Sequence, residues 1–163
     1  MSGQTEENDL IKQRKAKLEA IAKTGVYAYG EKFEVSSLVN VLKESFSEDG
    51  RVSLAGRIMA CREHGKSKFY DLKDASDRIQ LYIQKDIIGP DNYKFLDNLD
   101  IGDFIGVSGE TFKTRTGEPT IKVESVKVLA KSLRPLPEKW HGLKDVETRY
   151  RQRYVDLVMN DDV

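Results

Sequence analysis

The spacing of apolar positions changes at Gly50, and this change divides the sequence into two kinds of segment. Before it, Glu7 to Lys23 places a narrow apolar stripe among good helix formers, and Ser36 to Phe46 repeats the helical spacing over a shorter stretch, with Ser36 or Ser37 able to cap it. After it, apolar residues alternate with polar ones, as in half-buried strands. We therefore expect two N-terminal helices followed by a β domain.

Five segments of the β domain show this alternation, and a short helix opening at Gly89-Pro90 separates the third from the fourth. Glycines lie inside the strands, where a small barrel must bend. This order favours an oligonucleotide-binding (OB) barrel, with an SH3-like barrel as the alternative, because the helix stands between strands three and four. The predicted strands cover residues 52–58, 69–73, 79–84, 104–112 and 120–129.

The predicted fold class is therefore mainly β: a five-stranded OB-fold barrel preceded by N-terminal helices, α+β overall. We expect a helical extension at residues 1–50 and the barrel at 51–131. Residues 132–163 begin with a proline-stiffened linker that leaves the barrel and continue as a charged segment.

The 27 basic and 27 acidic residues cancel, so the total charge does not indicate nucleic-acid binding. Only local clusters of basic residues could indicate it. Basic residues gather in 10–24, 51–83 and 110–154, although a solvated surface would give the same pattern. A single cysteine, Cys61, excludes an internal disulfide, and with two histidines it forms no zinc-binding spacing. No apolar run is long enough to cross a membrane, and no signal peptide is visible. We expect a soluble, cytoplasmic, metal-free module with no membrane partner.

Strand alternation turns Phe69 and Gln80 toward the outer face of the second and third strands, the face that OB-folds use for oligonucleotides. A ring can stack a base, an amide can read its edge and cations can hold phosphates. The alternative for Phe69 is a core position at an irregular strand start. The two loops that flank this face hold Arg62, His64, Lys66 and Lys68, and Lys113, Arg115 and Glu118.

Catalytic motifs are absent from the sequence. Gly65-Lys66-Ser67 resembles the end of a phosphate-binding loop, but Ala60 stands where that loop requires glycine. No dinucleotide-binding, nucleophile-elbow or zinc-protease motif occurs. His64 and His141 are interpreted as ordinary surface histidines. We therefore predict no catalytic residues.

The tail carries a family resemblance that extends over the whole chain. Residues 134–140 and 149–157 resemble the junction after the anticodon-binding domain in bacterial-type class II lysyl-tRNA synthetases. Residues 55–57, 78–82 and 113–118, and the Gly65-Lys66 turn, resemble the anticodon-binding domain itself. Aspartyl- and asparaginyl-tRNA synthetases share the barrel but not the whole sequence of these two tail segments.

The resemblance implies a role for four residues of the barrel. Phe69 would stack on the central anticodon uridine, Gln80 and Glu118 would read it, and Arg62 would add a basic contact. The partner would be lysine tRNA. With the local charges, it predicts phosphate contacts at Lys12, Lys15, Lys17, Lys66, Lys113 and Arg115.

The resemblance also implies what the chain leaves out. The family's catalytic domain would begin about where Val163 ends, so we expect ATP and magnesium to bind only there and this chain to be inactive and without cofactors. The parent enzyme would be a homodimer, and the chain alone a possible monomer. Three alternatives stay open: an independent single-strand-binding barrel, an aspartyl- or asparaginyl-type anticodon domain, and a mainly structural interaction domain. A tail that leads into another domain should leave apolar residues partly uncovered.

Overall fold

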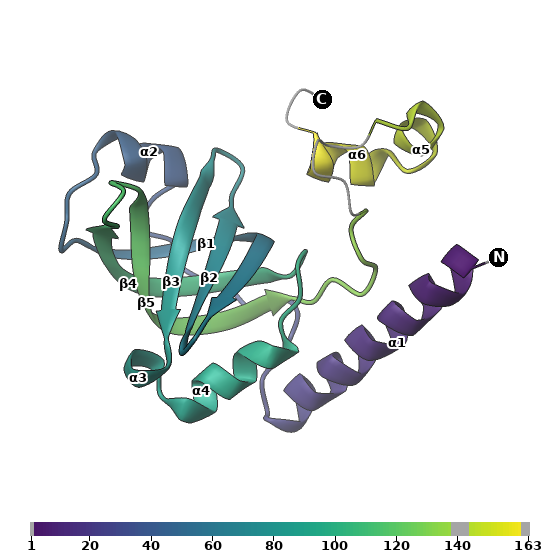
Figure 1. The fold of residues 1–163 in the computed structure, drawn as a ribbon, viewed down its shortest axis with the longest axis horizontal. Coiled ribbons are helices and arrows are strands. Elements are labelled where there is room, and N and C mark those ends of the chain that lie inside the picture. The colour runs from purple at the N-terminus through teal and green to yellow at the C-terminus, as the bar shows by residue number, and fades with distance from the viewer. Residues whose placement is uncertain (1, 138–143, 161–163) are drawn as a thin grey trace.

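A closed barrel of five strands forms the centre of the molecule (Figure 1). The computed structural model describes the backbone of residues 2–137 and 144–160, and the side chains from residue 9 onward within those ranges. Along the chain the elements are α1 (Ser2–Lys23), α2 (Val39–Glu44), β1 (Arg51–His64), β2 (Ser67–Lys73), β3 (Arg78–Gln84), α3 (Lys85–Ile88), α4 (Pro90–Phe95), the 3-10 turn η1 (Leu96–Asn98), β4 (Phe104–Lys113), β5 (Pro119–Ala130), α5 (Val146–Arg151) and α6 (Arg153–Met159).

The strands follow the order β1-β2-β3-β5-β4 around the barrel, and β4 closes back onto β1. Neighbouring strands are antiparallel except β3 and β5, which run parallel. Helices α3 and α4 stand between β3 and β4, as in an OB-fold. The predicted fold class is confirmed, and the SH3-like alternative is wrong.

Alternate residues of each strand point inward and form the core, as the sequence pattern predicts. Fully buried side chains include Leu54, Leu72, Leu81, Ile105 and Ile121, one from each strand. Glycine at position 56 is required by close strand packing, since a Cβ there would lie 2.5 Å from the Lys73 carbonyl oxygen.

Helix α2 is shorter than the predicted Ser36-to-Phe46 helix, and neither predicted serine caps it. Its first backbone N–H, from Val39, instead donates to Asp74 Oδ2 at 2.8 Å, and the next donates to Ser76 Oγ at 3.1 Å. Both acceptors belong to the turn between β2 and β3. The cap is therefore tertiary, and it attaches α2 to the barrel.

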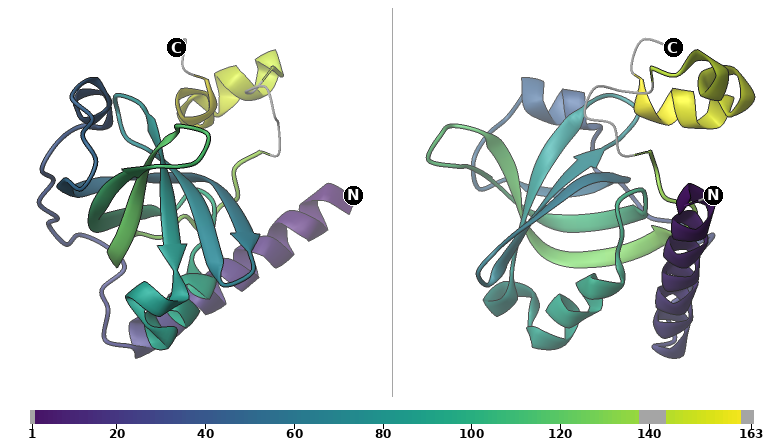
Figure 2. Two further views of the ribbon diagram at one scale, coloured as in Figure 1. Left: turned by 60° about the vertical axis from the view of Figure 1, so that its left-hand side comes forward. Right: turned by 45° about the vertical axis from the view of Figure 1, so that its right-hand side comes forward.

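Helix α1 runs along the side of the barrel at which β5 ends (Figure 2), beginning at Ser2 rather than at the predicted Glu7. Polar contacts hold it there: Arg14 donates to the Ser132 carbonyl at 2.8 Å, and Lys17 Nζ lies 2.6 Å from Asp100 Oδ1. Ile21 is fully buried against the core. Burial alone would raise the pKa of Asp100, but hydrogen bonds from Lys131 and Lys17 lower it below its usual range.

Beyond the barrel, residues 132–137 are irregular, and α5 and α6 follow the six residues that lie outside the described ranges. Asp156 is fully buried and accepts from Arg149 at 2.7 Å and Arg153 at 2.6 Å. Tyr150, at 76% exposure, and Leu157, at 57%, are exposed, so the tail has the uncovered apolar side chains that we expected. The expectations for Trp140 and His141 fall outside the described residues. No helix in the described ranges is long and apolar enough to span a membrane.

Candidate nucleic-acid interface

The outer face of β2, β3 and β5 carries two rows of side chains set by the strand register. Phe69 lies opposite Tyr82, which lies opposite Lys122. One step along the strands, Asp71 lies opposite Gln80, and Gln80 opposite Thr120. An aromatic row and a polar row therefore run side by side across the face.

Phe69 lies on this outer face, and the core alternative is wrong. Its neighbour Tyr70 is 2% exposed and points inward, whereas Phe69 is half-buried and its ring packs on Tyr82 with centroids 5.1 Å apart. Tyr82 in turn meets Phe112 at 5.9 Å. Three rings from three strands thus form a continuous aromatic row.

Gln80 faces outward as predicted, but its neighbours cover it to 8% exposure. Its Oε1 accepts from Arg62 Nη2 at 3.1 Å, and its Nε2 donates to Thr120 Oγ1 at 3.1 Å. The amide is therefore held in one orientation. Nε2 carries two hydrogens, and the bond to Thr120 uses one of them.

Arg62 projects from the end of β1 over the polar row. Its guanidinium bonds Asp71 Oδ1 at 3.0 Å as well as Gln80, and 60% of its side chain is exposed. One arginine thus fixes the amide and places a positive charge at the edge of the face. Asp71 and Thr120 were not predicted as site residues, although alternation from Phe69 and Gln80 places Asp71 and Thr120 on the same face.

Glu118 lies at the end of the loop between β4 and β5, which approaches the same face. The loop turns at Gly117, whose φ of 84° favours glycine, and the Glu118 backbone N–H donates to Thr114 Oγ1 at 3.1 Å. The Glu118 side chain is exposed, as are Lys113 and Arg115. Lys113 Nζ stands 5.9 Å from the Phe46 ring.

The predicted phosphate contacts divide into two groups. Lys66, Lys113 and Arg115 are exposed on the loops that flank the face. On α1, Lys15 is exposed and Lys12 pairs loosely with Asp9, whereas Lys17 is committed to Asp100. Lys17 therefore contributes to docking α1.

Lys68, in the loop predicted to be basic, points into the barrel and is 6% exposed. Its Nζ bonds Asp97 Oδ1 at 2.6 Å and lies 5.3 Å from the Tyr93 ring. Burial disfavours its charge, but the bond to Asp97 outweighs burial and raises the pKa of Lys68. Lys68 thus joins β2 to the helices below the barrel and is not part of the outer face.

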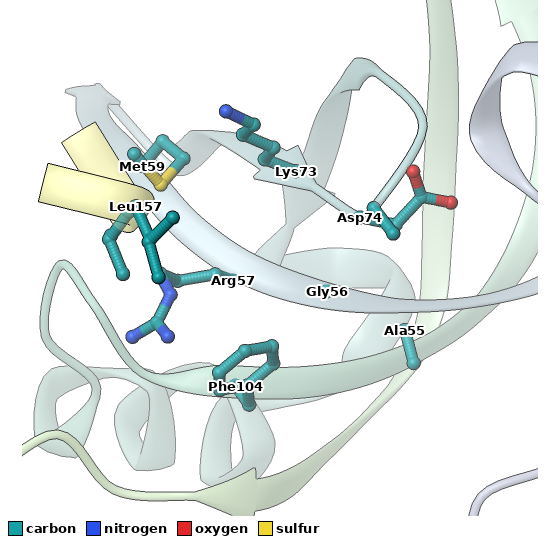
Figure 3. A pocket seen from close by; sticks show the side chains of 10 residues that line it. Ala55, Gly56, Arg57, Met59, Lys73, Asp74, Phe104 and Leu157 are labelled. Carbon is teal, nitrogen blue, oxygen red and sulfur yellow. The ribbon is translucent and has the colours of Figure 1, made fainter. Parts of the chain in front are cut away.

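A pocket of 390 Å³ opens where α6 meets β1 (Figure 3), and no residue of the aromatic row lines it. Arg57 lies over the Phe104 ring at 4.3 Å, and Leu157 of α6 and Met59 complete one wall. Residues of α6 and residues of the barrel thus line the same pocket. Within the described ranges, no three His, Cys, Asp or Glu side chains gather in a way that could hold a metal ion.

Comparisons with known proteins give one match over the barrel and other matches over nearly the whole chain. Residues 52–129 match the family of OB-fold nucleic acid binding domains. The chain is similar to lysine–tRNA ligases of Moorella thermoacetica (50% identical), Carboxydothermus hydrogenoformans (51%) and Thermosipho africanus (48%). The matches cover 96%, 96% and 92% of this chain and 32% of each relative. The chain thus spans about a third of the length of these relatives.

Proposed function

Residues 52–129 match the family of OB-fold nucleic acid binding domains, and from this match we propose that the barrel binds the anticodon of lysine tRNA within a lysine–tRNA ligase. The observation that carries the proposal is the half-buried Phe69 ring beside a Gln80 amide that Arg62 and Thr120 hold in place. A ring takes any base, but an oriented amide distinguishes among them.

The oriented amide suits uracil. Uracil presents an N3–H donor between two carbonyl acceptors. With its oxygen engaged by Arg62, Gln80 offers an N–H to a carbonyl, while the exposed Glu118 carboxylate accepts from N3–H. Central uridine, the shared feature of lysine anticodons, is therefore the base that this proposal assigns to Phe69.

The loop cations supply the remaining affinity in this proposal. Lys66, Lys113 and Arg115 flank the face and would neutralise phosphates on either side of the stacked base. Lys12 and Lys15 would extend the contact along α1. The proposed partner is thus the anticodon stem-loop of lysine tRNA. It would be bound through its shape, its charge and hydrogen bonds to the edge of one base.

Within the proposed ligase, attachment of lysine with ATP and magnesium belongs to a catalytic domain outside the barrel. The uncovered Tyr150 and Leu157 fit a segment that packs against such a domain or a second subunit. A homodimeric, cytoplasmic parent enzyme is the setting that we propose. The barrel would contribute tRNA selection and no chemistry.

Titration of the purified chain with anticodon stem-loops tests the proposal. We expect a stem-loop with the lysine anticodon to bind more tightly than stem-loops of the same length with aspartate or unrelated anticodons. Equal affinity for all of them would favour an independent single-strand-binding barrel. Preference for the aspartate or asparagine loop would favour the anticodon domain of those relatives.

A further inference from the structure

The hydroxyl of Thr120 lies between the two residues that the proposed function treats as readers of the base. It accepts a hydrogen bond from Gln80 Nε2 at 3.1 Å and donates one to the Glu118 backbone carbonyl, also at 3.1 Å. Thr120 is fully buried, so its side chain offers no surface for contact with RNA. Any effect of this hydroxyl on base selection must therefore act through Gln80 or Glu118.

The chemistry of the partners fixes the direction of these bonds. The Arg62 guanidinium can only donate, so the oxygen of the Gln80 amide faces it and Nε2 faces Thr120. Because Nε2 also only donates, the Thr120 hydroxyl must accept on that side, and its single proton is left for the Glu118 carbonyl. The bonds thus form one directed chain from Arg62 through Gln80 and Thr120 to Glu118.

The Glu118 end of this chain belongs to the loop between β4 and β5. The same Glu118 carbonyl accepts from the Thr114 backbone N–H at 3.1 Å, and the Glu118 N–H donates to Thr114 Oγ1 at 3.1 Å. These two bonds close the loop on itself. The bond from Thr120 instead connects the loop to the amide of Gln80 on β3.

We propose that Thr120 is a positioning residue for base selection, because its hydroxyl holds the Gln80 amide and the Glu118 backbone in a fixed relation to each other. Without the hydroxyl, the Gln80 amide keeps only its bond from the largely exposed Arg62 and can pivot about it. The Glu118 backbone loses its connection to Gln80 at the same time. This inference rests on the proposed anticodon function and adds the residue that couples its two readers.

Thr120→Val tests this role, since valine keeps the branched shape and removes the hydroxyl. Anisotropy titrations compare stem-loops that carry uridine or cytidine at the central position. The preference for uridine should fall from about tenfold or more to about two- to threefold, a loss of the size that one hydrogen bond contributes. Affinity for the cytidine loop should change little. Thr120→Ser keeps the hydroxyl and should restore most of the preference.

Thr111→Val is the matched control. Thr111 is also a buried threonine of the barrel, at 1% exposure, but its hydroxyl donates to the Ser47 carbonyl at 2.7 Å and accepts from the Gly50 N–H at 2.8 Å. Thr111→Val should lower the melting temperature and leave the uridine preference at its wild-type value. Equal weakening of both loops by Thr120→Val, or the same loss of preference in Thr111→Val, would show a purely structural role and overturn the inference.

A measurement without RNA separates this inference from the proposed function. In the free chain, the Gln80 side-chain N–H that bonds Thr120 should exchange with water more slowly than the side-chain N–H groups of the exposed Gln13, as NMR can measure. Thr120→Val should abolish this protection, and its absence from the wild-type chain would overturn the inference.

The binding data then distinguish the two failures. Equal affinity of the wild-type chain for both loops, with the Gln80 protection intact, would defeat the proposed function. A wild-type preference that Thr120→Val leaves at full strength would overturn the role of Thr120 and leave the proposed function standing. Thermal melting checks folding, and should Thr120→Val not fold, Thr120→Ala removes the same hydroxyl and carries the same expectations.

Discussion

In the proposed function, Phe69 and Gln80 would provide the specificity of this barrel, and the two side chains would have different tasks. The ring would supply an apolar platform that accepts any base. The amide would supply a hydrogen-bond donor of fixed orientation. The amide would be selective because Arg62 occupies the Gln80 oxygen, which leaves an N–H for the base. A free glutamine would rotate to suit uracil or cytosine, whereas a fixed one suits only a partner with an acceptor at that place.

Loss of the Phe69 ring should separate binding from folding. Phe69→Ala is expected to weaken stem-loop binding by about 1–3 kcal/mol, the cost of removing a base stack. Stability should fall by less than the about 3–5 kcal/mol of a buried phenylalanine, because the ring is only half-buried. Fluorescence anisotropy and thermal melting measure the two effects.

Phe104→Ala is the control, since Phe104 is also an exposed barrel aromatic, at 36%, but stacks with Arg57 on a different face. Phe104→Ala should leave RNA affinity unchanged. An equal loss of affinity in both variants would mean that the loss in Phe69→Ala does not come from removing a ring that stacks on a base.

At the scale of elements, contacts close in sequence were predictable and distant ones were not. Alternation along β2 and β3 was sufficient to place Phe69 outside and Leu72 inside, because a strand fixes the direction of each side chain. The cap of α2 could not be read in the same way, since Val39 and Asp74 are 35 residues apart. Serines next to the helix were the local candidates, and the fold supplied a better acceptor.

The same limit applies to the charged residues of α1. The sequence shows a row of lysines without showing which carboxylates face them. Lys17 finds Asp100, 83 residues away, and is thereby removed from the pool of free cations. Likewise, the outward direction of Gln80 follows from the strand period, but its burial depends on Arg62 and Thr120, which come from two other strands.

The tertiary cap gives a prediction at this scale. Asp74→Ala should lower the free energy of unfolding by about 1–2 kcal/mol, because the Val39 N–H and the turn amides of Ser76 and Asp77 lose their acceptor. Ser37→Ala should change stability by a few tenths of a kcal/mol, since Ser37 caps nothing. Urea unfolding of both variants at neutral pH compares them, and a larger loss for Ser37→Ala would contradict the tertiary cap.

The effect of Asp74 should also depend on pH. Burial raises the pKa of Asp74, but hydrogen bonds from Ser76 and the backbone amides outweigh it and lower the pKa below its ordinary 3.8. A carboxyl with a lowered folded pKa stabilises above its unfolded pKa and loses that contribution as pH falls through the folded value. The difference between wild type and Asp74→Ala should therefore be full at pH 7 and shrink below about pH 4.

For the whole molecule, a net charge of zero conceals an uneven distribution of charge. Carboxylates such as Asp100 and Asp97 bond lysines that hold the fold together, while Lys66, Lys113 and Arg115 stand exposed beside the proposed site. Affinity should therefore fall steeply with salt despite the neutral chain. Local charge, and not total charge, sets the number of counterions released.

Salt titrations of lysine variants measure this arrangement. The slope of log affinity against log salt should become shallower by about 0.7 for each phosphate that the variant no longer neutralises. Lys66→Met and Lys113→Met should each show this change. Lys17→Met should not, because Lys17 is paired with Asp100, and deletion of residues 1–24 will report what Lys12 and Lys15 add. Unchanged slopes in the loop variants would show that these lysines do not bind the RNA.

The central claim is that the barrel selects uridine at the middle of the anticodon through Gln80 and Glu118. It is tested most directly by comparing the affinities of stem-loops that differ only by uridine or cytidine there. Cytosine places an acceptor at N3 and a donor at N4, which leaves the carboxylate and the amide mismatched at about 1–3 kcal/mol each. Replacement by cytidine should weaken binding about tenfold or more, and Glu118→Gln or Gln80→Ala should remove most of that difference without abolishing binding. Equal affinity of the intact chain for both loops would contradict the assignment of Gln80 and Glu118 as readers, leaving a barrel that holds RNA by charge and stacking alone.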